Sequence, residues 1–307
     1  MKIINKIIIV VSVLFIFLCS LITFYFKDEI YIYLRDNFLE ARKNITIEKN
    51  EYFKDKNYGF VKNTNDFIAK DKEHIIDILY TILNSGTSSF TFYCSDNYEE
   101  CLLDFETITS DKVLLSDISN FVHPYNSFSN IHVSFNNYGK LTVNVIKNYS
   151  NEEIKEIDKE VDKIIKNEIK DNMTPRDKIR TIHNYIINNS NYPSDEMLEK
   201  NGIKAYNKAN NNLFDKYGVC SGYADSMALF LEKFGYNNIK VSTKTHVWNL
   251  VYVENKWQHL DLTWIDPRIV GAPDSLEIIY FLVSSERLKE IDGENRIYNQ
   301  DIYLETK

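Results

Sequence analysis

The chain has 307 residues, which is enough for one large or two modest domains with a sizeable hydrophobic core. Hydrophobic residues make up 44% of the sequence and charged residues 26%, as in ordinary globular proteins. The net charge of -8 at pH 7 disfavours a nucleic acid partner, because phosphate backbones bind basic surfaces.

An uncharged apolar run from Ile7 to Phe26 follows two early lysines. Its length is about the ~20 residues that a membrane-spanning helix needs. No small-x-small cleavage pattern closes the run, so we expect a retained signal-anchor, a transmembrane helix over residues 1–26. Basic residues lie on both sides of the span, so the rule that the more basic flank faces the cytoplasm gives only a weak preference for one orientation. We expect a single-pass protein of the cell membrane with its body outside the cytoplasm.

The four cysteines fall into three settings. Cys19 lies in the apolar run, Cys94 and Cys101 are close together, and Cys220 is isolated. Cys94 and Cys101 can form a disulfide in an oxidising compartment. Two reduced cysteines in or near a core are an equal alternative at this point.

Residues 27–64 are charged and aromatic without a clear period, and we expect a stalk or linker there. Helical spacing follows in KEHIIDILYTILNS, a strand composition in SSFTFYC, and alternation on both sides of a turn in NIHVSFNNYGKLTVNVIKNY. These patterns predict a small α+β domain over residues 65–149.

Two helices are predicted next. Ser150 and Glu153 form a capping-box pattern before an amphipathic run, which predicts a long helix. A second helical period begins after Thr174, with Pro175 in its first turn.

Cys220 lies in DKYGVCSGYADSMALFLEKFG, at the start of a helical pattern that ends at Phe234 with Gly235 as the stop. The unpaired N–H groups and the dipole at a helix N-terminus favour a negatively charged thiolate. The same N–H groups can stabilise an oxyanion beside the sulfur. The alternative is a cysteine that is simply buried, as free cysteines often are.

A base for this nucleophile is available in KVSTKTHVWNLVYVENKWQHLDLTW, which predicts a β-hairpin. A two-residue turn at Glu254 and Asn255 places His246 and Asp261 on one face, one diagonal step apart. In this arrangement Cys220 attacks a carbonyl, His246 transfers the proton and Asp261 orients the imidazole.

Other roles exist for the same residues. His246 can be a hydrogen-bonded strand histidine, and Asp261 can cap a turn. A zinc site of His246, His259 and Asp261 is disfavoured, because we place His259 on the other face and no Cys-x-x-Cys pair is present.

Three separated segments, GVCSGYADSMALFL, THVWNLV and HLDLTW, resemble in order and spacing the motifs of the transglutaminase-like superfamily, particularly its membrane-anchored bacterial members. The resemblance covers roughly residues 150–270. It implies a papain-like α+β core, in which the cysteine begins a helix packed on an antiparallel sheet. We therefore expect a catalytic domain over residues 150–284 and a C-terminal tail over residues 285–307.

The resemblance also implies roles. The family's nucleophile, base and orienting acid correspond to Cys220, His246 and Asp261. In several members a tryptophan upstream of the cysteine donates to the oxyanion, whereas all three tryptophans of this chain lie downstream. Tyr206 is a candidate replacement, and Trp248 and Trp264 are expected to line the cleft or the core.

The activity implied by the resemblance is acyl transfer or hydrolysis at amide bonds of protein or cell-wall peptides, without a cofactor. A protease or amidase that acts purely by hydrolysis is one alternative. A binding module that keeps the fold without turnover is another. The substrate is not specified, because specificity is expected in loops such as residues 190–217.

Overall fold

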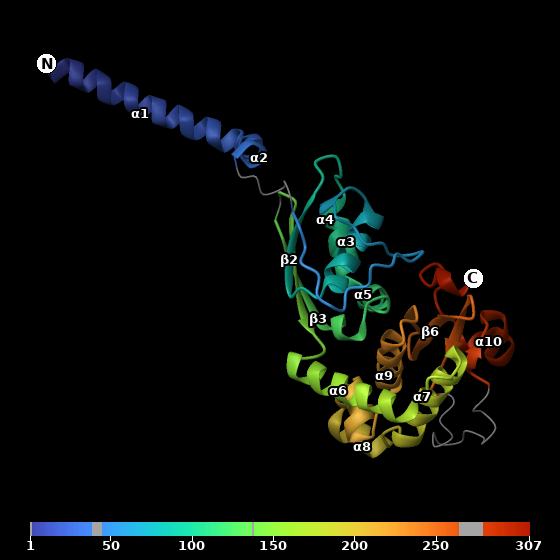
Figure 1. The fold of residues 1–307 in the computed structure, drawn as a ribbon. Coiled ribbons are helices and arrows are strands. Elements are labelled where there is room, and N and C mark those ends of the chain that lie inside the picture. The colour runs from blue at the N-terminus through green and yellow to red at the C-terminus, as the bar shows by residue number, and fades with distance from the viewer. Residues whose placement is uncertain (1, 39–44, 137, 264–278) are drawn as a thin grey trace.

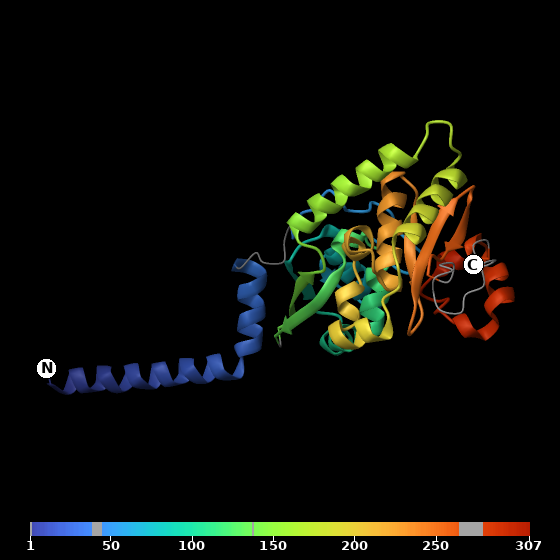
Figure 2. The ribbon, with the colours of Figure 1, turned by 90° about the horizontal axis from the view of Figure 1, so that it is seen from below.

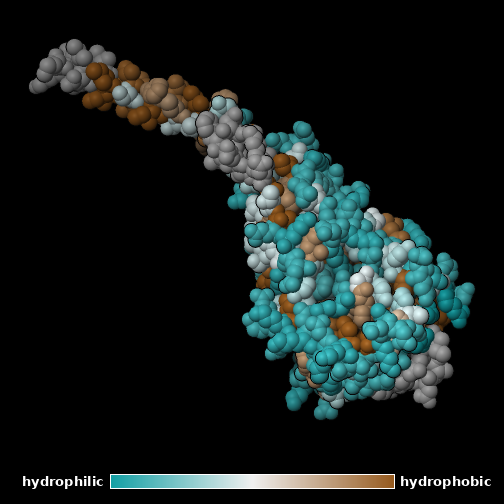
Figure 3. Space-filling view, viewed as in Figure 1, coloured by the Kyte–Doolittle hydropathy of each residue, from teal (hydrophilic) through white to brown (hydrophobic). Residues whose placement is uncertain are grey.

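The computed structural model describes residues 2–38, 45–136, 138–263 and 279–307 (Figure 1). Two helices, α1 (Lys2–Tyr25) and α2 (Lys27–Phe38), extend from the body that the rest of the chain forms (Figures 1 and 2). Within α1 the window Ile8–Tyr25 is long and apolar enough to cross a membrane, judged by length and composition. Every side chain of this window is outside the protein core, and its apolar surface contrasts with the hydrophilic body (Figure 3).

The first half of the body contains a four-stranded sheet with the order β1-β2-β4-β3. Its strands are β1 (Ile68–Ala69), β2 (Ser89–Cys94), β3 (Phe128–Phe135) and β4 (Lys140–Lys147). Only β1 and β2 pair in parallel among these strands. Helices α3 (Lys72–Ser85), α4 (Cys101–Ser110) and α5 (Lys112–Ser119) pack on one side of the sheet (Figure 1), and a short helix η1 (Pro124–Asn126) precedes β3.

Helices dominate the start of the second half. The capping box of Ser150 and Glu153 begins α6 (Asn151–Glu168), and Thr174 caps α7 (Pro175–Asn189), so both predicted helix starts are confirmed. After α7 come α8 (Asp195–Asn201) and two short helical segments, η2 (Ile203–Tyr206) and η3 (Asn211–Asp215). Residues 190–217 are therefore partly helical, where we had expected loops.

The predicted helix at Cys220 is confirmed as α9 (Cys220–Lys233), and Gly235 follows it in the left-handed region with a φ of 74°. Helix α9 packs against an antiparallel sheet with the order β5-β6-β7-β8 (Figure 2). The strands are β5 (Asn238–Ser242), β6 (Val247–Val253), β7 (Lys256–Leu260) and β8 (Phe281–Val283). Three further elements end the chain, α10 (Ser285–Asp292), η5 (Gly293–Arg296) and η6 (Leu304–Thr306).

The predicted hairpin register is confirmed. Val253 pairs with Lys256 across a two-residue turn. Glu254 and Asn255 both have positive φ, 54° and 62°, as the turns that match the twist of a hairpin require.

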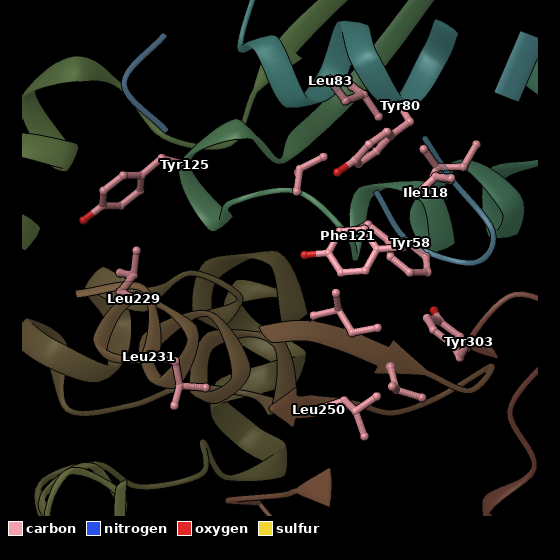
Figure 4. Packing of buried hydrophobic residues seen from close by; sticks show 14 of the residues in the cluster. Tyr58, Tyr80, Leu83, Ile118, Phe121, Tyr125, Leu229, Leu231, Leu250 and Tyr303 are labelled. Carbon is pink, nitrogen blue, oxygen red and sulfur yellow. The ribbon is translucent and has the colours of Figure 1, made fainter. Parts of the chain in front are cut away.

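A continuous hydrophobic core joins the two halves of the body (Figure 4). Phe121 of the first half lies between Tyr58 and the C-terminal Tyr303, with ring centroids 5.2 and 5.8 Å away. Leu231 of α9 and Leu250 of β6 belong to the same buried cluster. The mixed α+β class that we predicted is confirmed, while the boundaries at residues 65, 150 and 285 stay predictions.

A buried polar cluster reinforces this junction. The Tyr303 hydroxyl donates to Asp117 Oδ1 at 2.6 Å, and the Ser242 hydroxyl donates to the same oxygen at 2.8 Å. Asn120 Nδ2 donates to the Tyr303 hydroxyl at 2.7 Å. The last residues of the chain are thus fixed against both halves.

Candidate active site

Cys220 is the first residue of α9 and is half-buried with a free thiol. Glycines on either side of it let the chain pack closely. A Cβ on Gly218 would lie 2.0 Å from Oδ1 of Asn212, and a Cβ on Gly222 would lie 3.0 Å from the Tyr206 carbonyl oxygen. Larger residues at these two positions would push the segment before α9 away from its first turn.

Tyr192 lies beside Cys220, a neighbour that our sequence reasoning missed. Asn191 N–H donates to the Lys216 carbonyl at 2.8 Å, and Gly218 N–H donates to the Asn191 carbonyl at 3.0 Å. These bonds hold residue 192 next to the start of α9. Burial, followed by the charge of the Cys220 sulfur, raises the pKa of Tyr192 to about 12, while the Cys220 backbone N–H acts in the opposite direction.

His246 immediately precedes β6 and contacts Asp261, which follows β7. The distance between His246 Nε2 and Asp261 Oδ2 is 2.7 Å. Burial alone would lower the pKa of His246, but the charge and hydrogen bond of Asp261, and after them Cys220, raise it to about 9. Since Nε2 is bonded to Asp261, Nδ1 is the ring nitrogen left to serve the Cys220 sulfur.

Asp261 is almost completely buried, at 1% exposure, and both of its oxygens are bonded. Oδ1 accepts from the backbone N–H and the hydroxyl of Thr263, at 3.0 and 2.9 Å. Oδ2 accepts from His246 and from Arg296 Nη1, the latter at 2.9 Å. Burial would raise the pKa of Asp261, but His246, Arg296 and Thr263 lower it to about 2. The carboxylate is therefore charged at neutral pH.

The Trp248 ring covers one face of the His246 imidazole. The two rings stack with centroids 5.5 Å apart, and Trp248 is buried at 1% exposure. Its indole N–H donates to Nδ1 of His259 at 2.9 Å, so this donor is already occupied. Our prediction that His259 points to the other face is wrong, because His259 bonds to Trp248, the same ring that stacks on His246.

The remaining predicted residues lie as follows. Tyr206 accepts a hydrogen bond on its hydroxyl from Asn201 Nδ2 at 2.6 Å. Trp264 falls outside the described residues. Cys94 and Cys101 are joined by a disulfide. Among the residues that the structure describes, no group of three His, Cys, Asp or Glu side chains could hold a metal ion.

A family model described as the Transglutaminase-like superfamily matches residues 163–262, a range that includes Cys220, His246 and Asp261. Two solved structures are similar over 44% of this chain. One is the crystal structure of a TGase, with 16% identity and a TM-score of 0.32. The other is a candidate cysteine protease from Cytophaga hutchinsonii, with 14% identity and a TM-score of 0.27.

The likeness covers 44% and 61% of those two chains, less than two thirds of either. A search of curated proteins found no match. The range of the family model contains the Cys220 and His246 motifs and ends within HLDLTW, one residue after Asp261. Residues 163–262 are a transglutaminase-like domain.

Proposed function

We propose that Cys220, His246 and Asp261 act as a catalytic triad that transfers or hydrolyses acyl groups at amide bonds. The observation that carries the proposal is the 2.7 Å contact of His246 with the buried Asp261, with Cys220 adjacent at the start of α9. A base needs an orienting partner on one ring nitrogen and the nucleophile on the other, and this arrangement supplies both.

The first half-reaction follows from these positions. The Cys220 thiolate attacks the carbonyl carbon of an amide, and the carbonyl electron pair moves to oxygen. The His246 imidazolium then gives its Nδ1 proton to the amide nitrogen, and the C–N bond breaks as the oxyanion re-forms the carbonyl. A thioester on Cys220 and a free amine, or ammonia from a glutamine side chain, are the products.

The second half-reaction reverses the proton transfer. Neutral His246 takes a proton from water or from a second amine, which attacks the thioester carbon and releases the Cys220 thiolate. Water gives hydrolysis, and an amine gives acyl transfer. Asp261 holds the imidazole and balances its charge throughout.

The oxyanion needs two donors near the sulfur. We propose that the Cys220 backbone N–H is one and the Tyr192 hydroxyl the other, because the hydroxyl contacts both this N–H and the Cys220 sulfur, and an incoming oxyanion would take the place of the contact between them. Tyr206 stays a weaker candidate, since its hydroxyl is engaged by Asn201. Protein or cell-wall peptides are the proposed substrates, reached by a body that α1 anchors to the outer face of the membrane.

The nucleophile is tested without knowledge of the substrate, by iodoacetamide alkylation of the full chain in detergent. Peptide mass spectrometry separates Cys220 from the exposed Cys19. We expect Cys220 to react faster than Cys19 at pH 7, and His246→Ala to remove that difference. Equal rates at Cys220 in wild type and His246→Ala would refute the catalytic proposal.

Transfer and hydrolysis are separated by a second assay. The protein is incubated with a glutamine peptide and a labelled primary amine, with Cys220→Ala as the control. Label incorporation indicates transfer, whereas ammonia or peptide release without incorporation indicates hydrolysis. A protein that passes the alkylation test and shows neither reaction on a broad peptide library would favour the binding module.

A further inference from the structure

Arg296 comes from the segment 285–307, which we had expected to be a tail. It is the last residue of η5, and its side chain is 4% exposed. Nη1 donates to Asp261 Oδ2 at 2.9 Å, and Nε lies 2.9 Å from Asp292 Oδ2. A buried arginine with two carboxylate partners is held in one orientation, because its planar guanidinium binds both at once.

Two aromatic rings complete the setting of this guanidinium. Its central carbon is 5.0 Å from the centroid of Trp248 and 4.7 Å from that of Tyr280. Trp248 is the same ring that stacks on His246. Arg296 therefore contacts both Asp261 and the Trp248 ring that stacks on His246. It lies 35 residues beyond Asp261 in the sequence.

We infer that Arg296 is a positioning residue, which fixes the Asp261 carboxylate and offsets part of its negative charge so that His246 can release its proton. The inference rests on the proposed function. A buried carboxylate bonded only to His246 would stabilise the imidazolium more strongly, and an imidazolium that keeps its proton is a poor acid for the leaving amine. A permanent positive charge on the other side of Asp261 limits that effect.

Titratable side chains of the described residues approach His246 from two elements. Asp261 approaches it from the end of β7 and Cys220 from the start of α9. His259, beyond Trp248, is uncharged at neutral pH because burial, followed by the charge of Arg296, lowers its pKa to about 3. Tyr192, beside Cys220, is also uncharged at neutral pH. Among the described residues, Arg296 is the cation bonded to Asp261, and we expect it to tune the Asp261–His246 pair.

The test measures the rate of Cys220 alkylation by iodoacetamide between pH 5 and 10, in the full chain in detergent. The alkaline transition in this profile is assigned to His246 as the one that His246→Ala abolishes. In Arg296→Gln, which keeps a hydrogen-bond donor but loses the charge, we expect this transition to move upward. The expected shift is roughly 0.5–1 pH unit, less than the 1–3 units of a directly adjacent charge. In Arg296→Lys, which keeps the charge, it should stay near the wild-type position.

The outcomes separate the two proposals. A wild-type profile without a His246-dependent transition would overturn the catalytic proposal itself. A His246-dependent transition at the same pH in wild type and Arg296→Gln would overturn only the role of Arg296, since packing alone leaves the transition in place. If Arg296→Gln does not fold, Asp292→Asn loosens the arginine without removing its charge. In Asp292→Asn the rate of Cys220 alkylation at pH 7 should fall several-fold, while the His246-dependent transition stays at the wild-type pH. An alkylation rate equal to that of the wild type would refute the inference.

Discussion

His246 Nε2 lies 2.7 Å from Asp261 Oδ2, although 15 residues separate them in the sequence. The turn between β6 and β7 brings them together, because the pairing of Val253 with Lys256 sets the register of the whole hairpin. A shift of one residue would send one of the two side chains to the opposite face. The charge state of His246 therefore depends on the geometry of a two-residue turn.

We predict that Asp261→Asn lowers the pH range in which the Cys220–His246 pair is active. Burial alone would lower the pKa of His246, but the Asp261 carboxylate, followed by Cys220, raises it from its ordinary 6.5 to about 9, so the imidazolium persists through neutral pH in the wild type. Asparagine removes this effect and leaves burial, which lowers the pKa. The alkaline limb of activity should then move down by roughly two to three units, and the rate should fall on the order of 10²–10⁴-fold.

The measurement is the pH profile of Cys220 alkylation or of turnover. Asp301→Asn is a matched control, because the Asp301 side chain is 94% exposed. An unchanged alkaline limb in Asp261→Asn would contradict the orienting role.

We predict that Tyr192→Phe slows acyl transfer by roughly 10²–10³-fold, the usual cost of one oxyanion donor. Alkylation of Cys220 has no oxyanion and should change much less than acyl transfer, because only the contact of the hydroxyl with the sulfur is lost. Tyr206→Phe, which loses a hydroxyl bonded to Asn201, is the matched comparison and should keep most of its turnover. A slower acyl transfer in Tyr206→Phe than in Tyr192→Phe would contradict this prediction and make Tyr206 the oxyanion donor.

Local patterns predicted the parts of the site that depend on short-range geometry. The caps at Ser150 and Thr174, the start of α9 at Cys220 and the hairpin register all follow from residues within a few positions of each other. For His259 the predicted hairpin register is correct, but the predicted face of the sheet is wrong.

Contacts between distant segments could not be predicted in this way. Tyr192 reaches Cys220 because the Asn191 N–H donates to the Lys216 carbonyl and the Gly218 N–H donates to the Asn191 carbonyl, two bonds that no local pattern indicates. Arg296 lies in a short helical turn without hydrophobic period, so nothing in its surroundings marks it as a partner of Asp261. Both assignments require the three-dimensional path of the chain.

We predict that Lys240→Ala destabilises the protein by roughly 3–5 kcal/mol, the typical cost of breaking a buried ion pair. Lys240 Nζ donates to Asp225 Oδ1 of α9 at 2.6 Å, and the two side chains are 11% and 5% exposed. Asp225 also accepts from the Tyr149 hydroxyl at 2.7 Å, so it would keep one partner.

Urea unfolding checks this prediction, with the exposed Lys244→Ala as the control. The double variant Asp225→Leu, Lys240→Met should be less destabilised than Lys240→Ala, because no charge stays buried without its partner. Equal unfolding midpoints for wild type and Lys240→Ala would show that the pair is not needed to hold α9 on β5.

We predict that the double variant Cys94→Ala, Cys101→Ala is less stable than the oxidised wild type by about 2.5 kcal/mol at most. The disulfide links residues only seven positions apart, and the entropy that a cross-link removes from the unfolded chain rises slowly with loop length. Cys94 ends β2 and Cys101 begins α4 in the first half of the body, whereas Cys220 begins α9 in the second half. Alkylation of Cys220 should therefore be unchanged in the folded variant, whereas a large loss would mean that the first half of the body helps to position the nucleophile.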